Sequence, residues 1–153
     1  MEYKSNKGIT MVALLVTVVI MILLAAVTIN IGTREIERAK LEDLKTTMLL
    51  IKGRAQIVAD KEEFGENYDS TGMLTLEEAI RYNTSNLQSI FSNIDTSNLY
   101  IWEQTAMDNN NIQVTVTNTD FYVVDYETGE VYYSLGFTYE DNTYYSLTEL
   151  QNV

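Results

Sequence analysis

Two residue types are missing from this 153-residue chain, which contains no cysteine and no histidine. Without cysteine, no disulfide can cross-link the fold and no thiol chemistry is available. Without histidine, the chain lacks the side chain most often used for proton transfer near neutral pH and the commonest imidazole ligand of metals. These absences exclude Ser-His and Cys-His catalysis and the zinc sites that these residues form. No glycine-rich phosphate loop or nucleophile elbow occurs either, so we expect no enzymatic activity.

Positive charge is also scarce, but only in the second part of the chain. Residues 1–60 carry eight basic and six acidic side chains, whereas residues 61–153 carry two basic side chains against sixteen acidic ones. The net charge is therefore +2 for the first segment and −14 for the second. An acidic surface repels the phosphate backbone, so we predict that residues 61–153 do not bind nucleic acid. A well-solvated surface is the simplest explanation of this charge.

An uncharged apolar run of 23 residues extends from Ile9 to Ile31 and follows Lys4, Lys7 and Gly8. About 20 apolar residues are enough for a helix to cross the hydrocarbon core of a membrane. A secretory signal has a shorter apolar centre of about 7–15 residues, and its small-residue cleavage site comes after that centre. Here the small residue and the basic residues precede the run. The order is therefore inverted relative to a signal peptide.

The segment Lys7-Gly8-Ile9-Thr10-Met11-Val12, followed by the apolar residues from Ala13 onward, resembles the prepilin cleavage and methylation motif. Proteins with this motif are type IV prepilins and the pilin-like subunits (pseudopilins) of type II secretion and competence systems. The resemblance implies that a membrane-embedded prepilin peptidase cleaves between Gly8 and Ile9 and that the new amine of Ile9 is N-methylated. The assembly positions that it implies next to the cleaved bond are Thr10, Met11, Val12, Ala13, Leu14 and Leu15.

The resemblance also divides the chain into four segments and orients them. Residues 1–8 would be a leader peptide in the cytoplasm, residues 9–32 the transmembrane and assembly half of a helix, residues 33–60 its amphipathic half, and residues 61–153 an acidic head outside the cytoplasm. The distribution of basic residues alone indicates the opposite orientation, because four of them follow the apolar run closely and two precede it. We follow the resemblance, because the opposite orientation would put the cleavage glycine on the wrong side of the membrane.

Ala13 departs from the family pattern, which usually has a glutamate at the fifth residue of the mature chain. In the family this carboxylate is thought to pair with the terminal amine of a neighbouring subunit, and a buried ammonium without a partner is costly. Pilin-like proteins of Gram-positive bacteria often lack the acid, so the resemblance extends to that group. The chain also has no proline, which many family helices carry near the end of the apolar half. We therefore expect a minor or divergent subunit rather than a major pilin.

Beyond Gly32, apolar residues recur every three or four positions, which predicts one apolar face of an amphipathic helix. This face comprises Leu41, Leu44, Met48, Ile51, Ala55, Ile57 and Val58. No strong break separates the segment from the apolar run, so we predict one continuous helix from Ile9 to Asp60. The first half is apolar on every side and needs lipid or similar helices around it. The second half needs other parts of the protein to pack against its single apolar face.

The head is predicted to begin with a loop over residues 61–71 and two short helices. One is expected over residues 75–82, where Thr75 and Glu78 form a capping-box pattern, and the other around Leu87–Phe91. From Leu99 the apolar residues alternate, which predicts an antiparallel meander. Its strands are expected at 100–102, 112–118, 121–126, 131–135 and 144–147, with turns at 108–111, at 126–130 around a left-handed Gly129, and at 140–142.

The sequence therefore predicts an α+β fold in which a small antiparallel β-sheet head closes over a long N-terminal helix. The resemblance implies the same pilin-like arrangement. Seven of the eleven tyrosines fall between Tyr122 and Tyr145. Tyrosine suits half-buried strands, so we assign these side chains to the surface of the sheet and the edge of its core. An adhesive or carbohydrate-binding face is the alternative.

No cofactor is expected, although the sequence leaves calcium open. Calcium takes six to eight oxygen ligands, and the segments 108–111 and 140–143 are rich in side chains that supply them. Asp108 and Asp141 are the candidate ligands. Neither segment has the spacing of an EF-hand.

Two functions fit these patterns. The first is a structural subunit of a type IV pilus-like filament or of a secretion or competence pseudopilus. Such a subunit sits in the membrane, is processed by prepilin peptidase, and joins other pilin-like subunits in a filament at the cell surface. The alternative is a single-pass, membrane-anchored surface protein whose head binds a ligand and never polymerises.

Overall fold

The computed structural model describes residues 7–67, 69–85, 87–92 and 95–153, without the side chains of residues 7–10, 27–33, 88 and 89. The chain divides into two compact units, Met1–Lys40 and Leu41–Val153. Its helices are α1 (Lys7–Glu63), α2 (Gln88–Phe91), α3 (Gln104–Asn109) and α4 (Leu147–Gln151). Its strands are β1 (Met73–Thr75), β2 (Leu99–Trp102), β3 (Tyr122–Asp125), β4 (Val131–Tyr139) and β5 (Asn142–Ser146).

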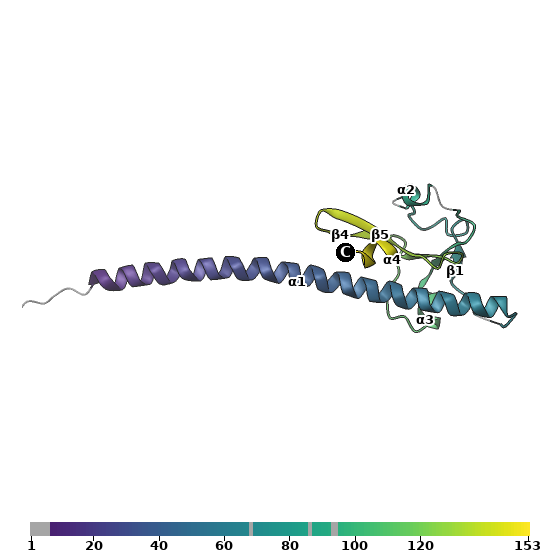
Figure 1. The fold of residues 1–153 in the computed structure, drawn as a ribbon, viewed down its shortest axis with the longest axis horizontal. Coiled ribbons are helices and arrows are strands. Elements are labelled where there is room, and N and C mark those ends of the chain that lie inside the picture. Colours follow the sequence, from purple (N-terminus) through teal and green to yellow (C-terminus); the bar gives the residue numbers. More distant parts are fainter. Residues whose placement is uncertain (1–6, 68, 86, 93–94) are drawn as a thin grey trace, which may run out of the picture. The chain divides into compact units, whose positions relative to one another are not determined.

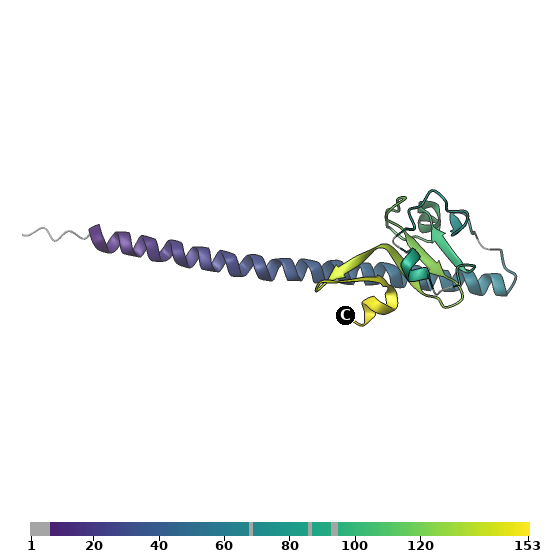
Figure 2. The same cartoon turned by 90° about the horizontal axis from the view of Figure 1, so that it is seen from above.

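Helix α1 confirms the predicted continuous helix, and it ends at Glu63 rather than at Asp60. The five strands form one antiparallel sheet in the order in which they occur along the chain. The predicted meander is confirmed for β2 to β5, whereas β1 is not predicted from the sequence. Trp102 lies opposite Tyr122, and Tyr122 lies opposite Tyr133. Figures 1 and 2 show this sheet beside the last part of α1.

One face of the sheet packs against α1. The buried side of α1 consists of Leu41, Leu44, Met48, Ile51, Ala55 and Val58. The opposing core residues include Trp102, Tyr122, Val124 and Val131 from the sheet, and Leu147 and Leu150 from α4. Steps of three and four place the α1 residues on one side of the helix. The predicted closure of the sheet over this stripe is therefore confirmed.

The other face of the sheet is covered by the segment between β1 and β2. Successive strand residues point to opposite faces, so Leu99, Ile101, Phe121 and Val123 form a second core. Residues from the covering segment, among them Leu87 and Phe91, fill the space above them. Helix, sheet and covering segment thus make an α+β fold that resembles the pilin architecture.

The strand predicted at residues 112–118 is absent. Its alternation is real, because Ile112 is buried and Val114 and Val116 are half-buried while their neighbours are exposed. The backbone nevertheless bonds to a side chain: Gln104 Nε2 donates to the Val114 carbonyl (3.0 Å), and the Val116 amide donates to Gln104 Oε1 (2.9 Å). Strand β2 already pairs with β1 and β3, so no edge of it is open to this segment.

The turn predicted at residues 108–111 is present, because the Asn111 amide donates to the Asp108 carbonyl at 3.0 Å, but the helix that leads into it, α3 (Gln104–Asn109), is not predicted. Two further local predictions are wrong. The helix predicted over residues 75–82 is a series of turns after β1, although Thr75 and Glu78 do form the capping-box hydrogen bonds. Those bonds close a single turn that does not continue. Ile57 was assigned to the buried face of α1 but is 46% exposed.

Candidate functional site: the apolar half of helix α1

The apolar segment of α1 is exposed on every side in the single chain. Each described side chain from Met11 to Ala26 is exposed, and the large apolar ones range from 46% for Val19 to 76% for Met11. These residues belong to the unit Met1–Lys40. Exposed contiguous apolar surface in a folded protein marks an interaction surface or a membrane-contacting surface. This segment is therefore the candidate functional site.

Local composition explains why the segment is helical and uninterrupted. It contains no proline or glycine between Ile9 and Ile31 and no charged side chain, so nothing breaks the backbone hydrogen bonds of the helix. Its polar side chains need local partners. Thr17 has such a local partner, because its Oγ1 donates a hydrogen bond to the Leu14 carbonyl at 2.8 Å. The hydroxyl is satisfied within the helix and leaves the surface apolar.

Side chains along this surface form a shallow apolar groove. It is lined by Met11, Val12, Leu14, Leu15, Val18 and Val19. These residues follow the spacing of three and four that creates ridges and grooves on a helix. The ridge of another apolar helix, or an acyl chain, has the right chemistry to fill such a groove.

The residues of the predicted cleavage motif lie at the start of α1. The helix begins at Lys7, which places the Gly8–Ile9 bond and Thr10 in its first turns; the side chains of Lys7 to Thr10 lie outside the described part. Most of the predicted leader, residues 1–6, also lies outside the described residues. Ala13 is exposed, and the apolar run offers no carboxylate that could replace the missing glutamate. If the chain is cleaved as predicted, an acid that balances the new amine of Ile9 has to come from outside this run.

Within the part of the chain that the structure describes, no helix is both long enough and apolar enough to span a membrane.

Comparisons of the chain with models of protein families, with curated proteins and with solved structures found no match.

The two calcium candidates lie in different settings. Asp108 is in α3, and its Oδ1 accepts a hydrogen bond from Gln104 Nε2 at 2.8 Å. Asp141 lies in the turn between β4 and β5 and has a left-handed backbone, with φ of 65°. Among the described residues, no group of three or more acidic side chains is arranged to hold a metal ion. The geometry of the described head thus gives calcium no support at either position.

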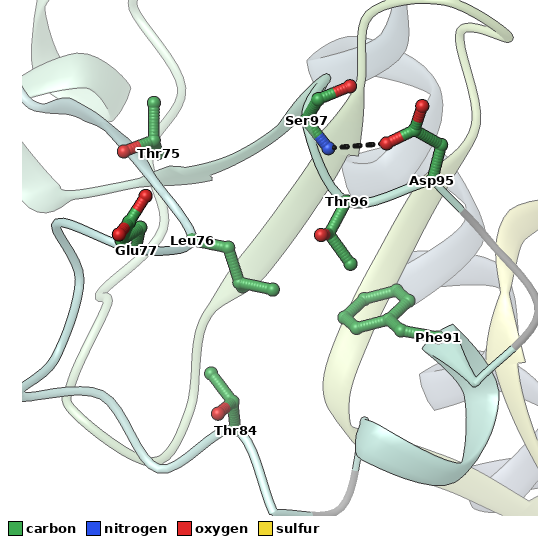
Figure 3. A pocket seen from close by; sticks show the side chains of 8 residues that line it. All are labelled: Thr75, Leu76, Glu77, Thr84, Phe91, Asp95, Thr96 and Ser97. Carbon is green, nitrogen blue, oxygen red and sulfur yellow. Dashed lines mark hydrogen bonds between the residues drawn. The ribbon is translucent and has the colours of Figure 1, made fainter.

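A pocket of ≈ 820 Å³ lies between the segment after β1 and the segment around α2 (Figure 3). Leu76 and Phe91 point into it from opposite sides. Its other lining residues are Thr75, Glu77, Thr84, Asp95, Thr96 and Ser97. Hydrogen bonds from Ser97 lower the pKa of Asp95, so this exposed carboxylate is ionised at neutral pH. The pocket offers hydrogen-bonding groups but no paired acid and base for catalysis.

The tyrosines of strands β3 and β4 contribute to the packing of the sheet. Tyr122 and Tyr132 are buried, and Tyr133 stacks on Tyr122 with ring centroids 5.2 Å apart. Burial raises the pKa of Tyr132 to about 12 and that of Tyr133 to about 12, and it also raises the pKa of Tyr122. These phenols stay neutral at physiological pH. The assignment to the sheet surface and the edge of the core is confirmed for the five tyrosines of this stretch that are half-buried, which are Tyr126, Tyr133, Tyr139, Tyr144 and Tyr145. Tyr122 and Tyr132 lie in the core instead.

Two further features of the unit Leu41–Val153 are not predicted from the sequence. Helix α4 has a complete capping box, because the Glu149 amide donates to Ser146 Oγ and the Glu149 carboxylate accepts from the Ser146 amide. The pattern Ser146-Leu-Thr-Glu149 was a usable signal for it. The exposure of Leu49, Leu50 and Ile57 on α1 was also missed, although the period of 3.6 residues places Leu50 opposite the buried stripe.

Proposed function

We propose that this chain is a minor or divergent structural subunit of a type IV pilus-like filament or of a secretion or competence pseudopilus. In this proposal prepilin peptidase removes residues 1–8, and the mature chain begins at Ile9. The apolar half of α1 holds the subunit in the membrane before assembly and packs among the helices of other pilin-like subunits afterwards. The acidic head stays outside the cytoplasm and has no enzymatic role.

The observation that carries the proposal is the combination of the motif Lys7-Gly8-Ile9 with an apolar helix that is exposed all round. Twelve large apolar side chains between Met11 and Leu24 are exposed. Burying each of them is worth about 1.5–3 kcal/mol, and the described part of the chain buries none of them. Such a segment needs a surrounding apolar medium, which a membrane or a bundle of like helices supplies.

The head supports the same proposal through its architecture. A sheet packed on the amphipathic half of a long helix is the arrangement expected of a pilin-like subunit. The described lining of the pocket between the segment after β1 and α2 has no paired acid and base, and the whole chain lacks histidine and cysteine. These features favour a structural role over an enzymatic one.

Mass spectrometry of the mature protein from a host that carries a prepilin peptidase tests the proposal. We expect an N-terminus at Ile9 and, if it is methylated, a mass increase of one methyl group. The variant Gly8→Val should retain the leader, because a side chain at this position blocks close approach of the protease to the backbone. The matched control Gly32→Val introduces the same side chain outside the motif and should be processed normally. An intact leader in the unmodified protein would refute the proposal.

A second measurement separates an assembled subunit from the alternative of a membrane-anchored binding protein. Filaments sheared from the cell surface should contain the processed chain. A processed chain that stays entirely in the membrane fraction, with none in sheared filaments, would favour the anchored binding protein.

A further inference from the structure

Helix α1 carries a second apolar surface within the unit Leu41–Val153, on the side away from the sheet. Leu49, Leu50 and Ile57 are 47%, 54% and 46% exposed. Leu50 and Ile57 are two helical turns apart and so lie on the same side. The buried residues Met48 and Ile51 point in another direction. With Gly53, these exposed residues form what we call the outer stripe: Leu49, Leu50, Gly53 and Ile57.

Gly53 lies in the middle of the outer stripe and has no structural use within the chain. It is exposed, and a Cβ built on it would meet nothing within 4 Å. A glycine inside a helix costs about 1 kcal/mol relative to alanine. No turn, left-handed backbone or close internal contact requires it, because it sits within α1. A glycine between exposed Leu50 and Ile57 creates a notch that lets another backbone or side chain approach α1 closely.

Basic side chains border the outer stripe on one side. Arg54 and Lys61 lie four residues after Leu50 and Ile57, which places them next to these residues on the helix surface. Both are exposed, and neither side chain forms an ion pair or hydrogen bond with any described residue. The surface is therefore apolar in the middle and positively charged along its edge.

The rest of the same unit has the complementary charge. Residues 64–153 contain fourteen acidic side chains and one basic one, Arg81. Arg81 is itself engaged, since its guanidinium pairs with the Glu103 carboxylate. Residues 41–63 of α1 carry four basic and five acidic side chains, and exposed Asp60 lies three residues after Ile57. The positive charge next to the stripe is therefore confined to the edge formed by Arg54 and Lys61, and the two ion pairs found among the described residues do not join these two side chains to the acidic residues of the head. This complementarity can be satisfied between two copies of the chain.

We propose that the outer stripe of α1, with Arg54 and Lys61, binds the acidic head (residues 64–153) of a second copy of this chain. The contact joins two different surfaces, so the copy that contributes its stripe keeps a free head and the copy that contributes its head keeps a free stripe. Such heterologous contacts build open, repeating assemblies rather than closed dimers. The inference rests on the proposed function, for which it names the partner surface.

Photo-crosslinking of the full chain in membranes of expressing cells tests this contact. A benzoylphenylalanine replaces Leu50 in one sample and Ile57 in another, and the crosslinked species are identified by peptide mass spectrometry. Mixing isotopically labelled and unlabelled chains distinguishes contacts between copies from contacts within one. We expect crosslinks between copies from both positions to peptides of residues 64–153. Crosslinks only to α1 of a second copy, to another protein or to lipid would overturn the proposal, and so would no crosslink.

Charge variants sharpen the test. The double variant Arg54→Glu with Lys61→Glu should lower the yield of the crosslink to the head about tenfold, because two attractive contacts become repulsive. The control Lys52→Glu reverses one charge on the same helix, where the double variant reverses two, and Lys52 is half-buried beside the Gly129 turn. It should alter the yield by less than about twofold. Equal yields from the double variant and the unmodified chain would overturn the proposal.

The N-terminal mass of the same samples separates this inference from the proposed function. Processing at Ile9 without a crosslink to the head would overturn the inference alone. An intact leader together with a crosslink to the head would overturn the proposed function and support the contact.

Discussion

Helix α1 presents apolar side chains in two regions that differ completely in burial. Between Met11 and Ala26 every described side chain is exposed, although the segment is far more apolar. Between Leu41 and Val58 charged residues are frequent, yet Met48 and Ile51 are fully buried. Burial therefore does not follow the average hydropathy of a segment.

The difference lies in how the apolar residues are distributed around the helix. In the second region they form one stripe, and the sheet of the same chain covers one stripe. In the first region they surround the helix, and a single small sheet cannot cover all sides of it. The second region thus completes its core within the chain, whereas the first is built for an environment that the chain does not supply.

Placing a charge in each region should separate these two roles, and the largest effect on folding is expected at Ile51. The variant Ile51→Asp buries a carboxylate without a partner, which should destabilise the head by more than about 4 kcal/mol and unfold it. Thermal unfolding followed by circular dichroism measures this. The neighbouring control Leu50→Asp is exposed and should change the free energy of unfolding by less than about 0.5 kcal/mol. Similar losses from both variants would contradict the assigned faces of α1.

In the apolar half, a charge should affect location and leave folding intact. We expect Leu15→Asp to unfold at the same temperature as the unmodified chain, because Leu15 is exposed. A carboxylate at the centre of a membrane helix costs about 2.5–3.5 kcal/mol, and Leu15 lies five residues before the centre of the run, so a smaller cost should still shift part of the variant from the membrane fraction to the soluble fraction. Fractionation with quantitative immunoblotting measures the shift. The control Leu15→Ile should behave like the unmodified chain, and an unchanged distribution of Leu15→Asp would argue against a membrane role.

Alkaline pH should act on the head and spare the apolar half, because no tyrosine occurs between Lys4 and Asn67. Burial raises the pKa of Tyr132 and Tyr133 to about 12, whereas tyrosine in an unfolded chain ionises near pH 10. Their contribution to stability is complete below about pH 10 and is lost as the pH rises toward about 12. Urea unfolding at a series of pH values should show this fall. A free energy of unfolding that stays constant from pH 9 to 12 would contradict the burial of these phenols.

The smallest effect is expected at Gly53. Replacement by alanine should stabilise the isolated chain by about 1 kcal/mol, because alanine favours the helix and a Cβ has open space here. The contrasting variant Gly72→Ala should destabilise it, since the backbone has φ of 83° and a Cβ would lie 2.8 Å from the Ala106 amide nitrogen. Chemical denaturation measures the change in the free energy of unfolding for each variant, which should be a gain for Gly53→Ala and a loss for Gly72→Ala. A loss of stability in Gly53→Ala would show that something in the chain already uses this notch.

Much of the fold could be predicted because it rests on local periodicity. Steps of three and four residues located the stripe from Leu41 to Val58, and alternation located β2, β3 and the start of β4. The turn before β4 followed from Gly129, which has φ of 68°. In each case neighbouring residues carry the information, and the tertiary structure agrees with it.

The wrong predictions concern segments whose structure depends on residues outside the segment. The alternation in residues 112–118 predicted a strand, but the Gln104 side chain occupies the backbone groups that a strand would pair. Nothing local to that segment reveals this bond. Ile57 was misplaced for a different reason, since it adjoins Val58 and only one of two neighbouring helix positions can face the sheet. For the candidate site, the sequence located the apolar segment, but the exposure of the outer stripe required the position of the sheet.

The two edges of the sheet carry a consequence for solubility. Its edge strands are β1, with three residues, and β5, with five residues that lead directly into the capped start of α4. An unpaired strand edge is a template for pairing with other chains, and short edges limit that pairing. At high local concentration, copies of the chain are thereby discouraged from joining their sheets into aggregates.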